Sequence, residues 1–341
     1  MRENDGALLA GAVMPLLYWY RAEGRRLPWR DDPTPYHVWV SEIMLQQTRV
    51  EAVKPYYERF LKKLPDIRSL AACEEDELLK LWEGLGYYSR VRNLQRGARY
   101  VTEYCGGELP QDAASLLKIP GIGPYTAGAI SSIAFGEPAP AIDGNVLRVL
   151  SRLLSDDADV TQTKTKARYH ALLTDVYPAG DAAAFTQSLM ELGACVCVPN
   201  GAPHCEACPL ADLCRARAEG REGSLPNKPP KKERRIEYRD VYLLVCDGRV
   251  ALRRRPDKGL LARLYEFPNV LCGEPFPDGA GAVPCGEATH IFTHVEWRMR
   301  GYFLKISSML PGYVFAAPEE LDEQYALPSA FRAFREMLTE K

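Results

Sequence analysis

The sequence lacks a hydrophobic run long enough to cross a membrane. Gly6–Tyr20 carries no charged residue, but it has only fifteen residues and contains Pro15, whereas a membrane-spanning helix needs about 20 apolar residues. Acidic Glu3 and Asp5 stand where a secretory signal is basic. Because the leucines of this stretch recur at helical spacing, we expect a helix packed in the core of a cytoplasmic protein.

A net positive charge is also missing. The 43 Lys and Arg residues oppose 45 Asp and Glu residues, which gives a net charge of −2. A site for nucleic acid must therefore be a local basic face on a balanced protein. There are no internal repeats, and the length of 341 residues exceeds that of one average domain, so we expect two domains.

The ten cysteines are not spread as in a disulfide-stapled secreted protein. Five of them fall between Cys195 and Cys214, and the others stand singly along the chain. A cluster of this kind in a chain with cytosolic character indicates a metal site rather than a disulfide framework.

The residue pattern divides the chain into a mainly helical domain at 1–219 and a second domain at 236–341. From Pro28 to about Leu213 no segment alternates as a strand does, and helices are expected at Ser41–Leu61, Glu74–Trp82, Ser89–Tyr104 and Ala127–Ala134. Residues 220–235 are rich in Gly and Pro and form a linker. Its basic residues either lie along phosphates or are simply solvated: Lys228, Lys231, Lys232, Arg234 and Arg235.

The second domain is expected to be of the α+β type. Short β-branched or aromatic runs bounded by Gly and Pro predict strands at Tyr238–Cys246, Arg249–Arg253, Ala288–Val295, Arg298–Ile306 and Tyr313–Ala316. The amphipathic stretch Ser329–Leu338 predicts a final helix.

The segment Leu117–Ala129 contains the strongest single motif. Gly121 and Gly123 let the backbone turn sharply and approach a ligand. Pro124 suits the first turn of a following helix, whose free N–H groups then point at an anion. The segment therefore predicts a phosphate clamp that does not read base sequence. It resembles the helix-hairpin-helix of base-excision DNA glycosylases.

Two carboxylates lie on either side of this hairpin in the sequence. Glu42 stands in an apolar helical run, so desolvation is expected to raise its pKa towards neutrality and keep it protonated. Asp143, beside Gly144 and free N–H groups, is expected to stay ionised. Cutting an N-glycosidic bond needs an acid for the leaving base and an anion for the sugar cation, and such a pair supplies both. Taken singly, each residue has an ordinary alternative, a turn cap for Asp143 and a solvated helix position for Glu42.

Five segments together resemble the MutY family of adenine DNA glycosylases. They are Leu27–Arg30, Trp39–Val50, Trp82–Leu94, Ile119–Ile130 and Ala141–Arg152. The similarity runs from about Leu16 to Cys214 and resumes in the second domain. The resemblance implies a helix-hairpin-helix glycosylase domain that removes adenine mispaired with 8-oxoguanine or guanine in double-stranded DNA. It also implies a monomeric bacterial protein that contacts no membrane and lies in the cytoplasm, at the nucleoid when it acts on DNA.

The resemblance assigns roles to individual residues. Glu42 would protonate adenine N7 and later assist water, while Asp143 would stabilise the sugar cation with support from Tyr125 and Asn145. Strand-cleaving relatives carry a lysine where this chain has Tyr125, which implies a monofunctional enzyme. The adenine pocket would consist of Arg25, Leu27, Trp29, Arg30 and Gln187. The contacts to DNA and lesion would be Gln47, Thr48, Leu85, Tyr87, Gly121 and Gly123, with core packing as the alternative for Tyr87.

The clustered cysteines Cys197, Cys205, Cys208 and Cys214 have the spacing C-x7-C-x2-C-x5-C. This resembles the loop, here residues 195–214, that holds a [4Fe–4S] cluster by four thiolates in this group of glycosylases. The usual first gap is six residues rather than seven, so Cys195 is a distant alternative for the first ligand. Zinc is the alternative metal, although only one C-x2-C pair is present.

The second domain resembles the MutT-like (Nudix-type) C-terminal domain of the same enzymes. The resemblance rests on Arg253–Pro256 and Gly259–Pro268, and the R-E-x-x-E-E core of pyrophosphohydrolases is absent. We therefore expect recognition without hydrolysis. Phe292-Thr293-His294 resembles a lesion-reading loop that more often has Ser in the middle, which makes Thr293 and His294 candidate lesion contacts. The alternative for His294 is an ordinary surface residue of a strand.

Other functions fit the sequence less well. A thymine or uracil mismatch glycosylase of the same superfamily would share the motifs, but those relatives generally lack a second domain. A non-catalytic iron–sulfur DNA-binding protein would leave Glu42 and Asp143 unexplained. Tyr125 disfavours a strand-cleaving lyase, and the missing signature excludes a nucleotide pyrophosphohydrolase.

Overall fold

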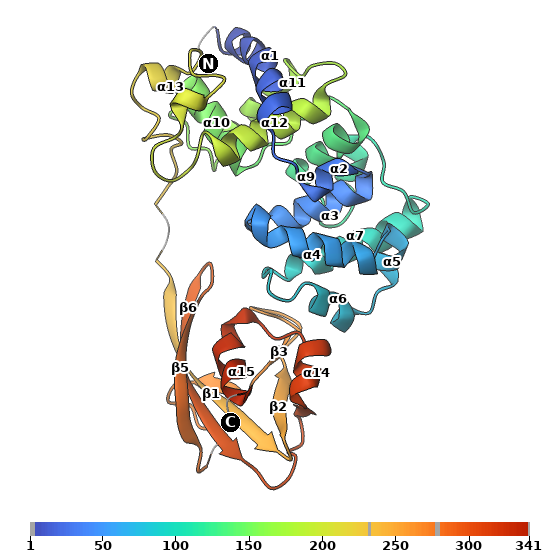
Figure 1. Ribbon diagram of the computed structural model, residues 1–341, viewed down its shortest axis with the longest axis vertical. Coiled ribbons are helices and arrows are strands. Elements are labelled where there is room, and N and C mark those ends of the chain that lie inside the picture. Colours follow the sequence, from blue (N-terminus) through green and yellow to red (C-terminus); the bar gives the residue numbers. More distant parts are fainter. Residues whose placement is uncertain (1–3, 231–232, 277–279, 340–341) are drawn as a thin grey trace. The chain divides into compact units, whose positions relative to one another are not determined.

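The computed structural model describes residues 4–230, 233–276 and 280–339. Lys231 and Lys232 of the expected linker lie outside the described residues. The helices are α1 Asp5–Glu23, α2 Pro28–Asp31, α3 Pro35–Leu45, α4 Val50–Lys63, α5 Ile67–Ala72, α6 Glu75–Leu81, α7 Ser89–Tyr104, α8 Ala113–Leu116, α9 Pro124–Ala129, α10 Gly144–Leu154, α11 Thr163–Thr174, α12 Ala182–Cys195, α13 Arg215–Ala218, α14 Pro318–Glu323 and α15 Arg332–Thr339 (Figure 1). The strands are β1 Arg235–Cys246, β2 Arg249–Arg254, β3 Tyr265–Glu266, β4 Asn269–Leu271, β5 Val283–Ile291, β6 Val295–Lys305 and β7 Val314–Ala316.

The chain forms two compact units. The first unit comprises Met1–Ala72 and Asn93–Pro230, and the second comprises Cys73–Arg92 and Lys231–Lys341. The second unit therefore takes a short segment from the middle of the helical region. Within the described ranges, no helix combines the length and apolar character needed to cross a membrane.

The first unit is helical, as expected, and no strand occurs in its described part. The helix predicted around Gly6–Tyr20 is confirmed as α1. It packs with α10, α11 and α12 around a hydrophobic core that contains the buried side chains of Leu16, Leu150, Tyr169 and Phe185. This core fixes α10 and α12, which carry much of the site described below.

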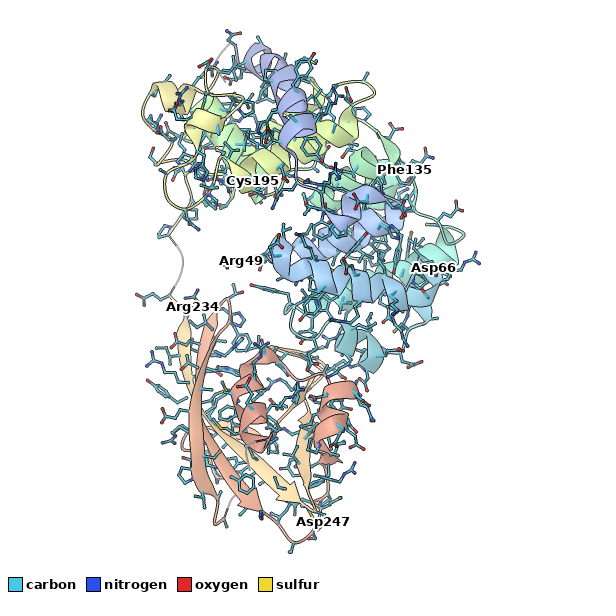
Figure 2. The ribbon with its side chains drawn as sticks, in the orientation of Figure 1. Arg49, Asp66, Phe135, Cys195, Arg234 and Asp247 are labelled. Carbon is cyan, nitrogen blue, oxygen red and sulfur yellow. The ribbon has the colours of Figure 1, made fainter. Side chains whose placement is uncertain are left out.

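The single helix expected over Ser41–Leu61 is wrong. α3 ends at Leu45 and α4 begins at Val50, and between them Gln47 has a left-handed φ of 59°. This conformation is unfavourable for a residue with a Cβ, and neither Gly nor Pro marks it in the sequence. Arg49 follows at the beginning of α4 (Figure 2). The break places Gln46–Thr48 on a turn rather than on a helix.

The hairpin forms as expected between α8 and α9. Gly121 has a φ of 86°, and a Cβ there would lie 2.9 Å from the Cβ of Asn93, so only glycine fits. Gly123 is the N-cap residue of α9, with Pro124 in the first turn. A Cβ at Gly123 would meet no atom within 4 Å, which leaves its backbone open to a ligand. A π-helical turn, Ile130–Ala134, continues α9.

The second unit contains a seven-stranded mixed sheet in the order β3-β2-β1-β6-β5, with β4 paired to β1 and β7 to β2. The long strands β1 and β6 run parallel, with Arg235 opposite Val295 and Val245 opposite Lys305. α14 and α15 lie against the sheet (Figure 1), and Phe331 shares a core with Trp297.

One expected strand of this unit is wrong in its bounds. β5 ends at Ile291 and β6 begins at Val295, so the predicted strand Ala288–Val295 runs across a hairpin turn. The amide of Phe292 donates to the carbonyl of Val295 across this turn, at 2.8 Å. Phe292, Thr293 and His294 therefore form a tight loop at the end of a β-hairpin.

Candidate active site

A cavity of about 1010 Å³ opens in the first unit, between α2, α3, α9, α10, α11 and α12. It brings together side chains that lie far apart in the sequence. Its lining contains all nine residues assigned above to catalysis or adenine binding, together with two of the assigned DNA contacts: Glu42, Tyr125, Asp143, Asn145, Arg25, Leu27, Trp29, Arg30, Gln187, Gln47 and Thr48. Gly121 and Gly123 lie outside this lining.

Glu42 is the one acidic residue of α3, and only 6% of it is exposed. Burial raises the pKa of Glu42 to about 7, a hydrogen bond from Tyr125 opposes the rise, and the charge of nearby Asp143 adds to it. The apolar neighbours in the sequence predicted this direction. Near neutral pH the carboxyl group therefore exchanges readily between its acid and its base form.

Tyr125 contacts a different carboxylate from the one expected. Its hydroxyl donates to Oε2 of Glu42, whereas we expected it to support Asp143. Burial, followed by the negative charges of Glu42 and Asp143, raises the pKa of Tyr125 well above its usual value. The phenol therefore stays neutral and remains a hydrogen-bond donor to Glu42.

Asp143 is the N-cap residue of α10. Its Oδ1 accepts from the backbone N of Val146 at 2.7 Å, and its Oδ2 accepts from Nδ2 of Asn145 at 2.7 Å. Asn145 thus supports this carboxylate as expected. Burial nevertheless raises the pKa of Asp143, and the hydrogen bonds reduce that rise without cancelling it. Burial thus opposes the expected ionised form of Asp143 and the hydrogen bonds favour it, so the ionisation of Asp143 stays a prediction.

Two close backbone contacts hold the turn that carries Asp143. A Cβ on Gly128 of α9 would lie 2.2 Å from the carbonyl O of Pro140, before the turn. A Cβ on Gly193 of α12 would lie 2.5 Å from the Cβ of Asn145, after it. Glycine at both positions allows the two helices to approach the turn from either side.

Arg148, buried on α10, links this turn to the cysteine-rich loop. Its Nη2 donates to Oδ1 of Asn145 at 2.9 Å and to the carbonyl of Gly193 at 2.6 Å. Its Nε donates to the carbonyl of Cys197 at 2.7 Å. One guanidinium therefore holds the residue that supports Asp143 and the first of the four clustered cysteines.

Glu191 is a residue of the cavity that the sequence analysis missed. Its side chain is 1% exposed and lies 2.6 Å from Nε of Arg25 and 2.8 Å from Nη2 of Arg30. Burial by itself raises the pKa of Glu191, but the hydrogen bonds and charges of the two arginines outweigh it and hold the pKa at about 2. The signals in the sequence were its position one helical turn after Gln187 and the two arginines that need a counter-ion.

Tyr20 is a second missed residue. It does not line the cavity, but its hydroxyl donates to Oε1 of Gln187, which does. The guanidinium of Arg30 lies 5.4 Å from the centre of its ring. Burial raises the pKa of Tyr20 above its ordinary value, so the phenol remains a donor. Tyr20 of α1 therefore holds Gln187 of α12, a residue of the expected adenine pocket, from outside the cavity.

The four clustered cysteines lie close enough in the first unit for their thiols to interact electrostatically. Burial raises the pKa of Cys208 to about 11; a hydrogen bond with the backbone of Leu210 opposes the rise, and the negative charges of the Cys197, Cys214 and Cys205 thiolates add to it. Nη1 of Arg152 lies 3.3 Å from Sγ of Cys197. Among the described residues, no three His, Cys, Asp or Glu side chains converge as the ligands of a single metal ion do.

Cys195, the alternative first ligand, lies elsewhere. It stands at the end of α12 (Figure 2), and its Sγ is 3.7 Å from Oε1 of Glu191. Cys195 therefore contacts a residue of the cavity lining. Cys197, which interacts electrostatically with Cys208, suits the first ligand position better than Cys195 does.

The remaining assigned residues belong to the second unit. Leu85 is buried, whereas Tyr87, Thr293 and His294 are exposed. The hydroxyl of Tyr87 lies 3.0 Å from Oγ1 of Thr293, so the two residues share a hydrogen bond. This hydrogen bond joins the segment before α7 to the β5–β6 loop.

Arg90 holds the loop that carries Tyr87. Its Nη2 donates to the carbonyls of Leu85 and Gly86 at 3.2 and 3.1 Å, and its guanidinium lies 5.4 Å from the centre of the Tyr87 ring. Burial lowers the pKa of Arg90 to about 10, so it remains charged at neutral pH. Tyr87 itself has a left-handed φ of 48°, a conformation that such contacts must stabilise.

Comparisons with known proteins first define a class. Residues 40–174 match the HhH-GPD superfamily of base excision DNA repair proteins, and residues 240–337 match the NUDIX domain. A thermostable thymine-DNA glycosylase has a similar structure, with a TM-score of 0.58, 28% identity, and coverage of 64% of this chain and 100% of its own. Endonuclease III in a non-covalent DNA complex gives a TM-score of 0.53 and 25% identity, and covers 63% of this chain and 97% of its own. The fold is that of a base-excision DNA glycosylase.

Curated relatives define the family more closely. The adenine DNA glycosylase of Mus musculus is 37% identical, over 85% of this chain and 70% of its own length. That of Homo sapiens is 36% identical over 87% and 67%, and that of Buchnera aphidicola (strain Sg) is 36% identical over 74% and 73%. The chain belongs to the adenine DNA glycosylase family and is a DNA glycosylase of base excision repair.

Proposed function

We propose that the chain excises adenine paired with 8-oxoguanine or guanine in double-stranded DNA, by flipping the adenine into the cavity and hydrolysing its glycosidic bond. The observation that carries this proposal is that the carboxyl groups of Glu42 and Asp143 line one cavity, and that Glu42 has a pKa of about 7. The protein is proposed to act as a monomer on nucleoid DNA in the bacterial cytoplasm.

Glu42 is the proposed general acid. In its protonated form it delivers a proton to N7 of adenine, and the neutral base then leaves. Asp143 stabilises the positive charge that develops on the sugar, held by Asn145 and the N–H of Val146. Tyr125 keeps one oxygen of Glu42 occupied, which leaves the other oxygen for the base and later for water.

The neighbouring lining is proposed to hold the flipped base and the opened duplex. Leu27 and Trp29 supply apolar surface, while Arg25, Arg30 and Gln187 supply polar contacts. Gln47, on the turn after α3, and Tyr87, in the second unit, are each proposed to insert into the duplex, which offsets part of the cost of a few kcal/mol for unstacking. Thr48 and Leu85 are proposed to line the lesion. Gly121 and Gly123 hold a phosphate through their backbone.

The remaining proposals concern recognition and the cysteine loop. Thr293 and His294 read the base opposite adenine. Cys197, Cys205, Cys208 and Cys214 would hold a [4Fe–4S] cluster through their four thiolates. The cluster would supply a rigid cross-link for the loop.

Adenine release from defined duplexes tests the proposed function. The protein is incubated with adenine opposite 8-oxoguanine, adenine opposite guanine and thymine opposite guanine, and abasic sites are then cut with alkali. We expect cleavage of the first two duplexes. Asp143→Asn is expected to bind them without releasing adenine. Release of thymine alone would favour a thymine mismatch glycosylase, and the structural likeness to one makes that duplex the necessary comparison.

A further inference from the structure

The second unit contains a segment from the helical region, Cys73–Arg92, which carries α6, the loop with Tyr87 and the first turn of α7. We propose that Lys80 and Glu83 are positioning residues that lock this segment to the C-terminal domain, so that Tyr87 and Thr293 act as one composite site for the base opposite adenine. This inference rests on the proposed function above.

The ammonium group of Lys80 has every donor satisfied. It donates to Oε2 of Glu83 at 2.5 Å, to the carbonyl of Leu321 at 3.0 Å and to that of Tyr325 at 3.1 Å. A lysine has three N–H donors, and two of these three acceptors are main-chain groups of α14 and the chain that follows it. The side chain of Lys80 therefore binds α6 to the backbone of the C-terminal part of the unit.

Glu83 binds the same C-terminal part of the unit through its other carboxylate oxygen. Its Oε1 accepts from the backbone N of Leu327 at 2.9 Å, while its Oε2 is bound by Lys80. The two side chains are only 16% and 19% exposed, so salt screens the pair weakly. Removing one partner would leave the other buried without its counter-charge, which costs more than the loss of a surface pair.

Further contacts join the same two parts near the ends of the segment. Glu75 pairs with Arg263 at 2.5 Å, and Asp76 accepts from Arg254 at 2.7 Å. Arg92 donates to the carbonyl of Ala262 and to Glu75. These contacts lie at both ends of the segment, and the Tyr87–Thr293 hydrogen bond lies between them. A loop held at both ends has little freedom to move its central tyrosine away from Thr293.

The chain offers a matched control for this pair. Glu51 and Lys54 on α4 have the same i, i+3 spacing and lie 2.8 Å apart, but the glutamate is 77% exposed. An exposed pair of this kind contributes at most about 1 kcal/mol to stability. Lys80→Met and Glu83→Gln can therefore be compared with Lys54→Met and Glu51→Gln, which remove equivalent charges away from the Tyr87 loop.

The experiment measures single-turnover adenine release opposite 8-oxoguanine, opposite guanine and opposite an abasic site, with the full-length protein. Loss of a charge-assisted hydrogen bond corresponds to about a tenfold change. We expect Lys80→Met and Glu83→Gln to lower the ratio of the 8-oxoguanine rate to the guanine rate by about that factor. The rate opposite the abasic site is expected to stay unchanged, because no base is left to be read. The Lys54 and Glu51 variants are expected to keep the wild-type ratio.

A double-mutant cycle adds a readout that general loosening of the fold does not produce. Tyr87→Phe removes the hydroxyl that meets Thr293, and its effect on the ratio is expected to be smaller in the Lys80→Met background than in the wild type. Equal ratios in the Lys80 and Lys54 variants, or an equal loss of rate on all three duplexes, would overturn the inference. A wild-type protein that releases no adenine would instead refute the proposed function.

Discussion

At the scale of single residues, Glu42 combines two properties that usually exclude each other. It is buried, which disfavours its charged form, and it accepts a hydrogen bond from Tyr125, which favours it. Desolvation is the larger effect, so the pKa of Glu42 lies near 7 rather than near 4.5. The folded state therefore binds the proton more tightly than the unfolded chain does.

This difference predicts how Glu42→Gln changes stability with pH. The wild-type protein has its full share of stability from Glu42 below pH 4.5 and loses it as the pH rises to about 7. A glutamine has no charge to desolvate, so the variant is expected to melt like the wild type near pH 4.5. From the shift of the pKa of Glu42, it should be more stable by about 3 kcal/mol at pH 8. Denaturant unfolding at both pH values checks this; a difference that does not grow with pH would contradict it.

Tyr125→Lys is expected to change the products of the reaction. The new amine would lie where the tyrosine hydroxyl contacts Glu42 in the cavity, and a lysine near the sugar can form a Schiff base that leads to strand cleavage. Borohydride trapping and gels without alkali treatment would detect both outcomes. Tyr125→Phe serves as control, because it alters the same contact without an amine. An unchanged product pattern in the lysine variant would count against the assignment.

Sequence reasoning succeeded at this scale where a residue's neighbours determine its environment. The apolar residues around Glu42 predicted its raised pKa. They did not predict the burial of Asp143, because that depends on helices far away in the sequence. Glu191 and Tyr20 were missed for the same reason, since a glutamate on a helix and a tyrosine in an apolar stretch each have an ordinary interpretation until the tertiary contacts are known.

At the scale of elements, the turn between the π-helical turn Ile130–Ala134 and α10 depends on Gly128 and Gly193, which lie outside it. Gly193→Ala places a methyl group 2.5 Å from the Cβ of Asn145, so either α12 or Asn145 must shift. Since small misplacements of catalytic groups can cost about 100-fold in rate, we expect slower adenine release with little change in DNA affinity. Single-turnover kinetics and binding measurements separate the two effects.

Gly11→Ala is the matched control for this substitution. Gly11 lies exposed inside α1, and a Cβ there meets no atom within 4 Å. Alanine is a better helix former than glycine, so this variant is expected to gain about 0.5–1 kcal/mol of stability and to keep its activity. Equal rates in the Gly193 and Gly11 variants would show that the turn tolerates the shift.

Elements with local signals were predicted, and those without were not. Gly121 and Pro124 mark the hairpin, because a positive φ and a first helical turn select these residue types. The break at Gln47 has no such mark, so two helices were taken for one. The β5–β6 turn was missed because Phe292, Thr293 and His294 continue the β-branched and aromatic character of the strands on either side.

At the scale of the whole molecule, the proposed cluster accounts for the packing of the cysteine loop, which has little regular structure apart from a short 3₁₀ turn at Cys205–Ala207. Cys208→Ser is expected to lower the melting temperature by several degrees and to weaken DNA binding, because the loop loses one of its cross-links. Iron and sulfide analysis checks the occupancy of the cluster. Cys195→Ser, away from the four thiols, should retain the wild-type melting temperature and DNA binding. A wild-type protein that contains zinc and no iron would overturn the assignment.

Two domains were expected from the sequence, but the residues that make up each unit were not fully predicted. The linker at 220–235 was visible from its composition, and the expected boundaries at 219 and 236 remain a proposal. The membership of Cys73–Arg92 in the second unit depends on non-local contacts such as Lys80 with Leu321. No periodicity or composition distinguishes that segment from the helices beside it.

The contact between Tyr20 and Gln187 has a consequence for selectivity. Because the amide oxygen is occupied from behind by the phenol, the NH₂ end of Gln187 is the end left for a base that enters the cavity. An NH₂ group facing inwards can donate to a ring nitrogen with a free lone pair, such as N1 of adenine, whereas guanine has an N–H donor at the same position. If adenine binds in this cavity as proposed, Tyr20 sets the hydrogen-bond polarity of the Gln187 side chain without lining the cavity itself.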